Sequence, residues 1–273
     1  MADQLNLPGP LWLLGCGNMA GAMLAGWLDA GLDPAEVTVI RPSGRQVADG
    51  VRVVTAPPAG DHPAILILGV KPQKIAEIAP VVTACLGERT IMVSILAGVE
   101  LATLRRLFPQ ACAIVRAMPN LPVRLREGVI GLYAGAEATG QAVVERLMAA
   151  LGLVEWLKDE RQMDVLTALA GSGPAFLYRF IDALAEAGTA LGLPREQAAR
   201  LAMGTVVGAA ASAAAAGEPP AILADRVASP GGSTRAGLNV LDEPGRGLLA
   251  LVQATLQAAV QRNREMAEEA RRG

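Results

Sequence analysis

Side chains that commonly act as catalytic bases are scarce in this chain. Of its 24 lysine and arginine residues only three are lysines, Lys71, Lys74 and Lys158, and its single histidine is His62. His62 lies in the loop sequence PPAGDHPA just before an expected strand, where we expect a surface or capping role. No lysine follows Lys158. General acid or base catalysis by His or Lys is therefore not indicated in the C-terminal part of the chain.

Cysteine is also scarce, with Cys16, Cys85 and Cys112 widely spaced in apolar runs. An odd number of such cysteines is typical of reduced thiols in a cytoplasmic protein and excludes a disulfide framework. The N-terminal sequence MADQLNLPGP lacks a basic segment followed by an apolar stretch, so we expect no signal peptide. No His and Cys spacing typical of a metal site is present, and we predict no metal.

A strong charge of one sign is missing, since the net charge is −2 and the isoelectric point is near 5.6. We therefore expect neither nucleic acid nor a membrane surface as a partner. The apolar stretch 201–217, LAMGTVVGAAASAAAAG, consists mainly of small residues, follows Arg195 and Arg200 closely, and contains Thr205 and Ser212. This composition favours a helix packed closely at a domain or subunit interface over a membrane span.

What the chain has in abundance is hydrophobic residues, which make up 52% of its 273 positions and can bury a substantial core. Short apolar runs alternate with amphipathic segments up to residue 157, and several runs are continuous. This pattern predicts a parallel sheet covered by helices on both faces. The expected strands are 11–15, 37–40, 64–70, 90–95, 111–117, 128–134 and 153–157, and the expected helices include 18–30, 73–85, 100–107 and 137–151.

The character of the sequence changes after Lys158, where helical spacing continues and no convincing strand follows. We place a domain boundary between residues 160 and 161. Helix breaks are expected at 192–194, 217–220, 228–233 and 242–247, where glycine and proline gather. Because isolated Ala-rich helices bury little surface, we expect this part of the chain to pack on a second subunit.

A glycine-rich turn follows the first expected strand. Gly15, Cys16, Gly17, Asn18 and Met19 lead from the strand LWLL into a helix, and Ala20 fills the third small position. In such a turn the first glycine permits the bend, the second lets the backbone approach a pyrophosphate, and the helix N-terminus favours its charge. The position of the turn between a strand and a helix predicts a dinucleotide site, with an ordinary tight turn as the alternative.

The end of the second expected strand indicates which dinucleotide binds. NAD enzymes usually place a carboxylate there for the ribose 2′-hydroxyl, but this chain reads Arg41-Pro42-Ser43-Gly44-Arg45 and has no carboxylate before Asp49. Arg41, Ser43 and Arg45 offer donors suited to a 2′-phosphate. We predict NADPH as the cofactor, with NADH as the alternative. The alternative to a role in cofactor binding is that Arg41 and Arg45 belong to a solvated surface loop.

The reaction should need neither a metal nor a strong protein base. The absence of lysine after Lys158 argues against the β-hydroxyacid dehydrogenases, whose similar two-domain plan uses a lysine on the corresponding helix. No Ser/His/Asp set is present either. A cyclic imine fits these limits, because its carbon is electrophilic once the nitrogen is protonated and hydride delivery then needs chiefly positioning.

Seven segments spread over essentially the whole chain resemble the pyrroline-5-carboxylate reductase family, whose members reduce 1-pyrroline-5-carboxylate to L-proline in the last step of proline biosynthesis. These segments are GCGNMAGAMLAG (15–26), LGVKPQ (68–73), VSILAG (93–98), VRAMPNLP (115–122), LAGSGPAFLYRFIDALAEAG (169–188), GLPREQA (192–198) and VASPGGSTRAGLNVLDE (227–243).

The resemblance implies an α/β N-terminal Rossmann-like NAD(P)-binding domain, residues 1–160, and an all-α C-terminal dimerisation domain, residues 161–273. It implies a homodimer, and family members often form decamers. The cofactor-binding positions that it implies, besides the glycine turn and Ser43, are Gly69, Val70, Lys71 and Pro72, then Ile95, Leu96 and Ala97, with Met118, Pro119 and Asn120 close to the nicotinamide. The substrate carboxylate would be held by Gly231, Gly232, Ser233 and Thr234, and the Thr234 hydroxyl would lie near the imine nitrogen.

The sequence of this second loop suits that role. Two glycines allow backbone N–H groups to point into one concavity, and the N-terminus of a following helix adds further donors, so a carboxylate can be bound without lysine. An ordinary helix N-cap after a Pro-Gly turn is the alternative. One departure from the family is Leu121, which replaces a threonine near the cofactor and puts one polar contact in doubt. A reductase of another cyclic imino acid and a non-catalytic NADP-binding scaffold stay open as alternatives.

Overall fold

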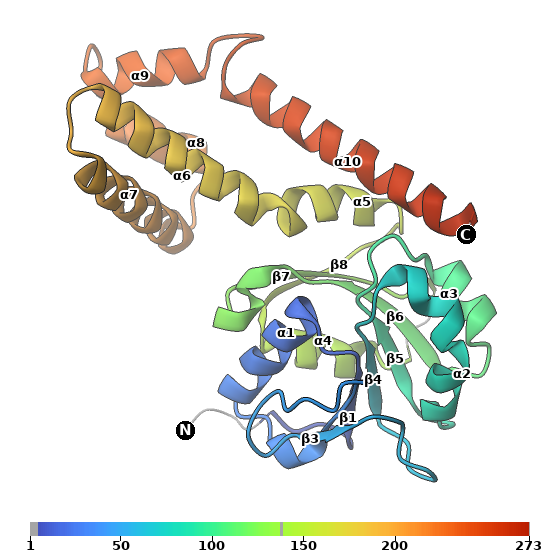
Figure 1. Ribbon diagram of the computed structural model, residues 1–273. Helices are drawn as coiled ribbons and strands as arrows, with labels where there is room; N and C mark the ends of the chain where they lie inside the picture. Colours follow the sequence, from blue (N-terminus) through green and yellow to red (C-terminus); the bar gives the residue numbers. More distant parts are fainter. Residues whose placement is uncertain (1–4, 137–138, 273) are drawn as a thin grey trace. The chain divides into compact units, whose positions relative to one another are not determined.

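We describe residues 5–136 and 139–272 of the chain in a computed structural model (Figure 1). Contacts divide the chain into two compact units. The first comprises the residues up to Gly171 together with those from Val260 onward, and the second comprises Ser172–Ala259. The first unit extends past the predicted boundary at 160 and 161 because Met163 is buried and Leu166 occupies the space that a side chain at Gly131 would need.

The first unit is built around an eight-stranded sheet with the order β3-β2-β1-β4-β5-β6-β7-β8. The two arms on either side of β1 correspond to the two halves of a doubly wound α/β sheet. Four strands are buried at every position, which explains their continuous apolar sequences. The strands are β1 Leu11–Leu14, β2 Val37–Ile40, β3 Arg52–Val54, β4 Ile65–Leu68, β5 Ile91–Ser94, β6 Ala113–Met118, β7 Gly128–Tyr133 and β8 Gly152–Trp156.

Helices cover both faces of this sheet (Figure 1). Residues of α1 (Asn18–Asp29) and α4 (Gln141–Ala149) share one buried apolar cluster with alternate residues of β1 and β4. Residues of α2 (Ile75–Cys85) and α3 (Leu101–Leu107) share a second cluster with the intervening residues of the same strands. The alternation of side chains along a strand thus produces two cores from one sheet. Short helical turns η1 Pro34–Glu36, η2 Pro72–Lys74 and η3 Leu121–Leu125 complete the connections, and α5 spans Gln162–Leu166.

Most predicted elements are confirmed within a few residues, and three features differ. The strand β3 was not expected, because its three residues are partly exposed and give no apolar run. The strand β7 runs antiparallel to β6, so the sheet is mixed where we expected a parallel one. Within the predicted helix 137–151, residues 137–138 lie outside the described residues and α4 begins only at Gln141.

The second unit is entirely helical, as predicted. It contains α6 Gly173–Ala190, α7 Arg195–Ala216, α8 Pro220–Val227, α9 Ser233–Leu241 and the first part of α10 Leu248–Arg272. Each interruption falls at a predicted glycine and proline break. Upstream of α6, the residues Thr167–Gly171 form a π-helical turn, designated η4, that the sequence pattern did not predict.

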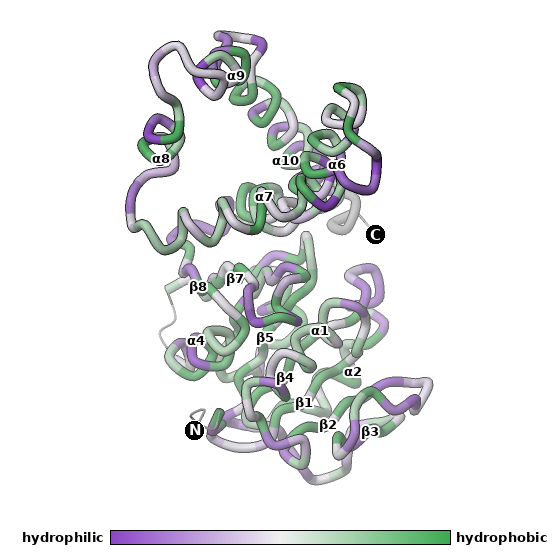
Figure 2. Tube along the Cα trace, turned by 90° about the vertical axis from the view of Figure 1, so that its left-hand side faces the viewer, coloured by the Kyte–Doolittle hydropathy of each residue, from purple (hydrophilic) through white to green (hydrophobic). Residues whose placement is uncertain are grey.

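This unit buries few of its hydrophobic side chains. Within residues 172–259, all of which are described, the buried hydrophobic residues are Ala198, Ala202 and Ala228. Large exposed hydrophobic residues occur on every helix, and Figure 2 shows hydrophobic stretches along α6, α7 and α9. By length and composition alone α7 could cross a membrane, although such a helix is weak evidence for one. A unit with so little core needs a further surface to pack against.

Candidate active site

The turn between β1 and α1 is fixed by strands on both sides. The amide of Gly15 donates to the Ile40 carbonyl at 2.9 Å, and the amide of Gly69 donates to the Leu14 carbonyl at 2.9 Å. Gly15 has a φ of +84°, and a Cβ atom added there would lie 2.7 Å from the Gly69 carbonyl oxygen. Only glycine fits this position without displacing backbone. The first glycine of the fingerprint therefore has the structural role predicted for it.

The start of α1 has the properties of an anion site. Gly17 is its N-cap residue in an extended conformation, no side chain caps the helix, and its first turn carries no acidic residue. A Cβ atom added at Gly17 would meet nothing within 4 Å. The third small residue, Ala20, is buried 3.1 Å from where a Cβ of Gly69 would lie, so helix and strand pack closely. The first N–H groups of a helix without a side-chain cap suit a pyrophosphate.

Cys16 lies inside this turn and is half-buried. Burial raises the pKa of its thiol, and the Arg41 guanidinium lowers it in part. Because the thiol stays neutral at physiological pH, it adds no negative charge beside the expected phosphate position. The hydrogen bond from the Gly15 amide to the Ile40 carbonyl holds the glycine turn beside the end of β2.

The segment after β2 is ordered by the unexpected strand β3. The Arg41 amide donates to the Val54 carbonyl at 2.9 Å, and the Gly44 amide donates to the Arg41 carbonyl at 3.1 Å. The Ser43 hydroxyl accepts from the Arg45 amide at 3.4 Å. Arg41 is half-buried, while Ser43 and Arg45 are exposed. Three donors predicted for a 2′-phosphate thus occupy one short loop at the carboxyl end of β2.

Two further predicted cofactor segments follow β4 and β5 at the same edge of the sheet. Gly69, Val70, Lys71 and Pro72 lead from β4 into η2, and Ile95, Leu96 and Ala97 follow β5. The Ile95 amide donates to the Leu68 carbonyl at 3.2 Å, which ties the two segments together. The structure therefore brings together at one sheet edge the glycine turn, the Arg41 to Arg45 loop and these two segments. Ligands of doubly wound sheets bind at this edge.

Asn120 is placed differently from the other predicted cofactor residues. Its side-chain oxygen accepts from the Val129 amide at 2.9 Å, and its side-chain nitrogen donates to the Ala170 carbonyl at 3.0 Å. It is 5% exposed. A buried amide with both ends bonded to backbone holds the start of β7 and the π-helical turn against the end of β6. The structure gives Asn120 this architectural role, and its contact with a cofactor stays a prediction.

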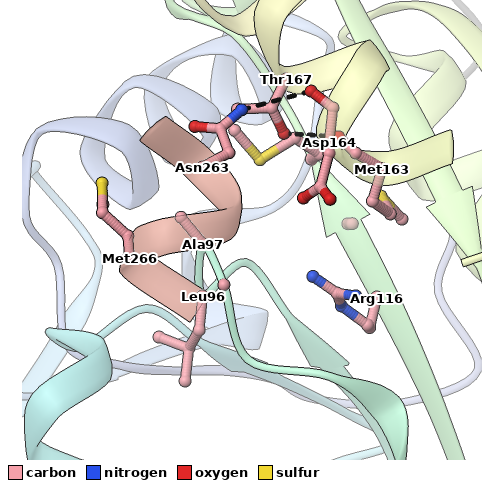
Figure 3. Close-up of a pocket in the computed structure, with 11 residues that line it drawn as sticks. Leu96, Ala97, Arg116, Met163, Asp164, Thr167, Asn263 and Met266 are labelled. Atoms are coloured by element: carbon pink, nitrogen blue, oxygen red, sulfur yellow. Dashed lines mark hydrogen bonds between the residues drawn. The ribbon is translucent and has the colours of Figure 1, made fainter. Parts of the chain in front are cut away.

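A pocket adjoins the Ile95 to Ala97 segment within the first unit (Figure 3). Its polar side chains are Arg116 on β6, Asp164 on α5, Thr167 and Asn263. The Arg116 guanidinium donates to Glu160 at 2.7 Å, and the Asn263 amide donates to the Asp164 carbonyl at 3.2 Å. Sequence reasoning missed this cluster. A charged residue inside the apolar strand sequence ACAIVRA was the available signal, whereas nothing marked Glu160.

The predicted substrate loop lies in the second unit, before α9. Gly231 has a φ of +73°, and Gly232 is the N-cap residue, in extended conformation and with no side-chain cap. The Gly232 amide donates to the Ser229 carbonyl at 3.0 Å, which closes the turn. Ser233 and Thr234 are both exposed in the first turn of the helix, and that turn carries no acidic residue. The loop therefore presents free helix N–H groups and two hydroxyls, as the sequence indicated.

Comparisons with protein families match the N-terminal and C-terminal parts of the chain to different family models. Residues 160–266 match the family model of the pyrroline-5-carboxylate reductase dimerisation domain, and residues 11–98 match that of NADP oxidoreductases described as coenzyme F420-dependent. Two relatives, each named pyrroline-5-carboxylate reductase, are 36% identical to the chain. The one from Pseudomonas aeruginosa aligns over 94% of this chain and 96% of its own length, and the one from Arabidopsis thaliana over 93% and 94%.

Solved structures give the same result. A pyrroline-5-carboxylate reductase from Coxiella burnetii matches with a TM-score of 0.84 and 32% identity, over 94% of this chain and 98% of that one. The Plasmodium falciparum pyrroline carboxylate reductase with NADP bound matches with a TM-score of 0.82 and 25% identity, over 97% and 100%. The glycine turn, the helical unit and the loop before α9 thus occur together in a chain that belongs to the pyrroline-5-carboxylate reductase family.

Proposed function

We propose that this protein reduces 1-pyrroline-5-carboxylate to L-proline with NAD(P)H. The observation that carries the proposal is that a chain of this family has two helix N-termini that follow glycine turns and carry neither a side-chain cap nor an acidic residue. One is the N-terminus of α1 after the glycine turn, and the other is the N-terminus of α9 after Gly231 and Gly232. A dinucleotide and a carboxylate are the two anions that such a reaction requires.

The proposed cofactor is NADPH, bound by residues 1–160. Backbone N–H groups at Gly15 to Met19 bind the pyrophosphate, and Arg41 and Ser43 bind the 2′-phosphate. The segments Gly69 to Pro72 and Ile95 to Ala97 line the rest of the site. When bound, the dihydronicotinamide supplies the hydride that reduces the imine carbon. The Plasmodium falciparum relative, which has NADP bound, supports this assignment.

Residues 161–273 are proposed to bind the substrate and the second subunit. Backbone groups of Gly231 and Gly232 and the Ser233 hydroxyl bind the carboxylate. The Thr234 hydroxyl, able to donate and to accept, orients the imine nitrogen and relays its proton. No lysine or histidine is needed for this role, because the substrate is activated by its own protonation.

The protein is a homo-oligomer in this proposal. The family has a dimerisation domain, and residues 172–259 bury few of their hydrophobic side chains within one chain. We propose that α7 packs at the subunit interface, that dimers assemble further into a decamer, and that the enzyme works in the cytoplasm. Light scattering coupled to gel filtration measures the mass directly, and a mass corresponding to one chain contradicts the proposal.

The activity is tested by following the near-ultraviolet absorbance of NADPH after adding 1-pyrroline-5-carboxylate. Consumption of NADPH with formation of proline is the expected result. A six-membered cyclic imino acid assayed beside it identifies the ring size, because faster turnover of the larger ring favours the alternative reductase. Tight NADPH binding with no oxidation by either imine favours a non-catalytic scaffold.

Cofactor choice is tested by the double variant Arg41→Ala/Arg45→Ala. Removing two cationic donors should raise the KM for NADPH roughly 10-fold or more, on the scale of lost charge-assisted hydrogen bonds, and leave the KM for NADH nearly unchanged. Arg89→Ala/Arg106→Ala is the matched control, since both arginines are exposed and lie outside the predicted cofactor segments. Equal effects on the two cofactors identify the 41 to 45 loop as an ordinary surface loop.

A further inference from the structure

A buried arginine and a partly buried glutamate form an ion pair beside the pocket that the predicted nicotinamide segments line. Arg116 is 8% exposed within β6, where its neighbours in the strand are buried apolar residues. Its guanidinium donates to Glu160 Oε1 at 2.7 Å. A buried charge is costly unless it is paired, and apolar pairs of similar volume are often at least as stable. The position of this pair is therefore better explained by what it holds in place than by stability alone.

Glu160 joins two parts of the site through one oxygen atom. Besides Arg116, Oε1 accepts a hydrogen bond from the Leu101 amide at 2.6 Å. Leu101 is the first residue of α3, whose N-cap residue provides no side-chain hydrogen bond to the helix. The carboxylate thus satisfies a free N–H at a helix N-terminus, where negative charge is favoured. We call these three groups the Arg116–Glu160–Leu101 network.

The network fixes one end of the segment that precedes α3. Ile95, Leu96 and Ala97 connect β5 to that helix, and Leu96 is buried. The connection turns at Gly98, which has a φ of +74° and lies beside the backbone of Ala267 in α10. With β5 at one end and the Leu101 amide fixed at the other, the segment has little freedom to move.

The same network reaches the end of β6. Arg116 and Met118 are two residues apart in a strand, so their side chains project to the same face. Both line the pocket with Leu96 and Ala97, and Figure 3 shows the Arg116 side chain projecting into it. The Met118 methyl group lies 3.3 Å from where a Cβ of Gly171 would be, so it contacts the π-helical turn. The pair therefore links two walls of the predicted nicotinamide site, the 95 to 97 segment and Met118.

We infer that Glu160 is a positioning residue for hydride transfer, acting through Arg116 and the Leu101 amide. It touches neither reacting group. It fixes the surfaces against which the nicotinamide lies, so its loss should misplace that ring and leave the phosphate sites intact. This inference rests on the proposed function for its kinetic part, while its binding part does not depend on the substrate.

Glu160→Gln is the informative variant, because the amide keeps an acceptor for Leu101 and removes the charge that pairs with Arg116. We expect kcat for imine reduction to fall roughly 10- to 100-fold, on the scale of a small misplacement of reacting groups. The KM for NADPH should change little. The primary kinetic isotope effect on kcat with deuterated NADPH should increase, because hydride transfer becomes more rate-limiting. Glu160→Ala, which removes the acceptor of both hydrogen bonds, should have the larger effect.

Arg161→Gln is the matched control. It breaks the ion pair of Arg161 with Asp159 next to Glu160 in the chain, but Arg161 is almost fully exposed. Such surface pairs contribute little, so kcat and the isotope effect should stay at wild-type values. An effect of Glu160→Gln no larger than that of the control overturns the inference.

A binding measurement separates positioning from general damage. Affinity for 2′,5′-ADP, which lacks the nicotinamide, should be the same within roughly 2-fold in wild type and Glu160→Gln, on the scale of the small coupling expected between separate sites. The fluorescence of the dihydronicotinamide in bound NADPH should shift between them. Loss of 2′,5′-ADP binding in parallel with turnover contradicts the inference. If the wild type reduces no imine, the proposed function fails. In that case the inference about Glu160 is overturned if the fluorescence of bound NADPH is the same in Glu160→Gln as in the wild type.

Discussion

Replacing Gly15 by alanine should nearly abolish NADPH binding and destabilise the fold. The new methyl group must displace either the Gly69 carbonyl or Val70, which it would approach at 2.7 and 2.9 Å, and the residue must keep a φ of +84°. Left-handed strain and overpacking together cost about 2–6 kcal/mol. Because the Gly69 segment also lines the predicted site, we expect NADPH affinity to fall roughly 100-fold or more, the factor that about 3 kcal/mol corresponds to.

Gly31→Ala separates the cost of left-handed backbone strain from the cost of the steric clash. Gly31 follows the same helix α1 and has a φ of +91°, but a Cβ atom there would meet no other atom within 4 Å. This variant should lose only the conformational part, about 1–2 kcal/mol, and bind NADPH as the wild type does. Thermal unfolding at fixed protein concentration and titration with NADPH measure both quantities. Similar losses in the two variants contradict a steric role for the close approach of Gly15 and Gly69.

Replacing Thr234 by alanine should reduce kcat for imine reduction roughly 10- to 1,000-fold, on the scale of losing one positioned donor. The Thr234 side chain is exposed, and it makes no hydrogen bond to any described residue. Its removal therefore breaks no contact that stabilises the chain, and the melting temperature should stay unchanged. Steady-state kinetics with 1-pyrroline-5-carboxylate, combined with thermal unfolding, test both parts of this expectation.

Two further variants test whether the loss of turnover comes from the Thr234 hydroxyl itself. Thr234→Ser keeps the hydroxyl and should recover most of the turnover. Thr255→Ala removes a hydroxyl on α10 that donates to the Leu251 carbonyl in the preceding turn, at 2.8 Å, and should leave turnover unaltered. An unchanged kcat/KM in Thr234→Ala excludes the assigned role for this hydroxyl. In that case a backbone group or a bound water must orient the imine nitrogen.

Much of the fold could be predicted because its signals are local. Continuous apolar runs identify the buried strands β1, β2, β4 and β5, and the glycine and proline breaks identify the ends of the C-terminal helices. The direction of β7 could not be predicted, because hydropathy is the same whichever way a strand runs. The edge strand β3 was missed for a different reason. It is short and partly exposed, so it depends on hydrogen bonds to β2 and not on burial.

The candidate site also contains features that the sequence could predict and features that it could not. The glycine turn and the Arg41 to Arg45 loop could be found because their chemistry lies within a few consecutive residues. The bonds of Asn120 and Glu160 could not be found, since each joins segments far apart in sequence. Asn120 donates to Ala170, and Glu160 accepts from Leu101. The π-helical turn was also hidden, because an i to i+5 turn leaves no distinct apolar period in five residues.

The strand order also has a consequence for folding during translation. The strand β1 lies between β2 and β4, and the turn after it is closed by the Ile40 carbonyl and by Gly69. The fingerprint sequence is made first, but its neighbours are translated later. A nascent chain therefore cannot assemble the dinucleotide turn until the ribosome has released residues up to about Val70, and a short N-terminal fragment that ends before β4 should carry the fingerprint without a site.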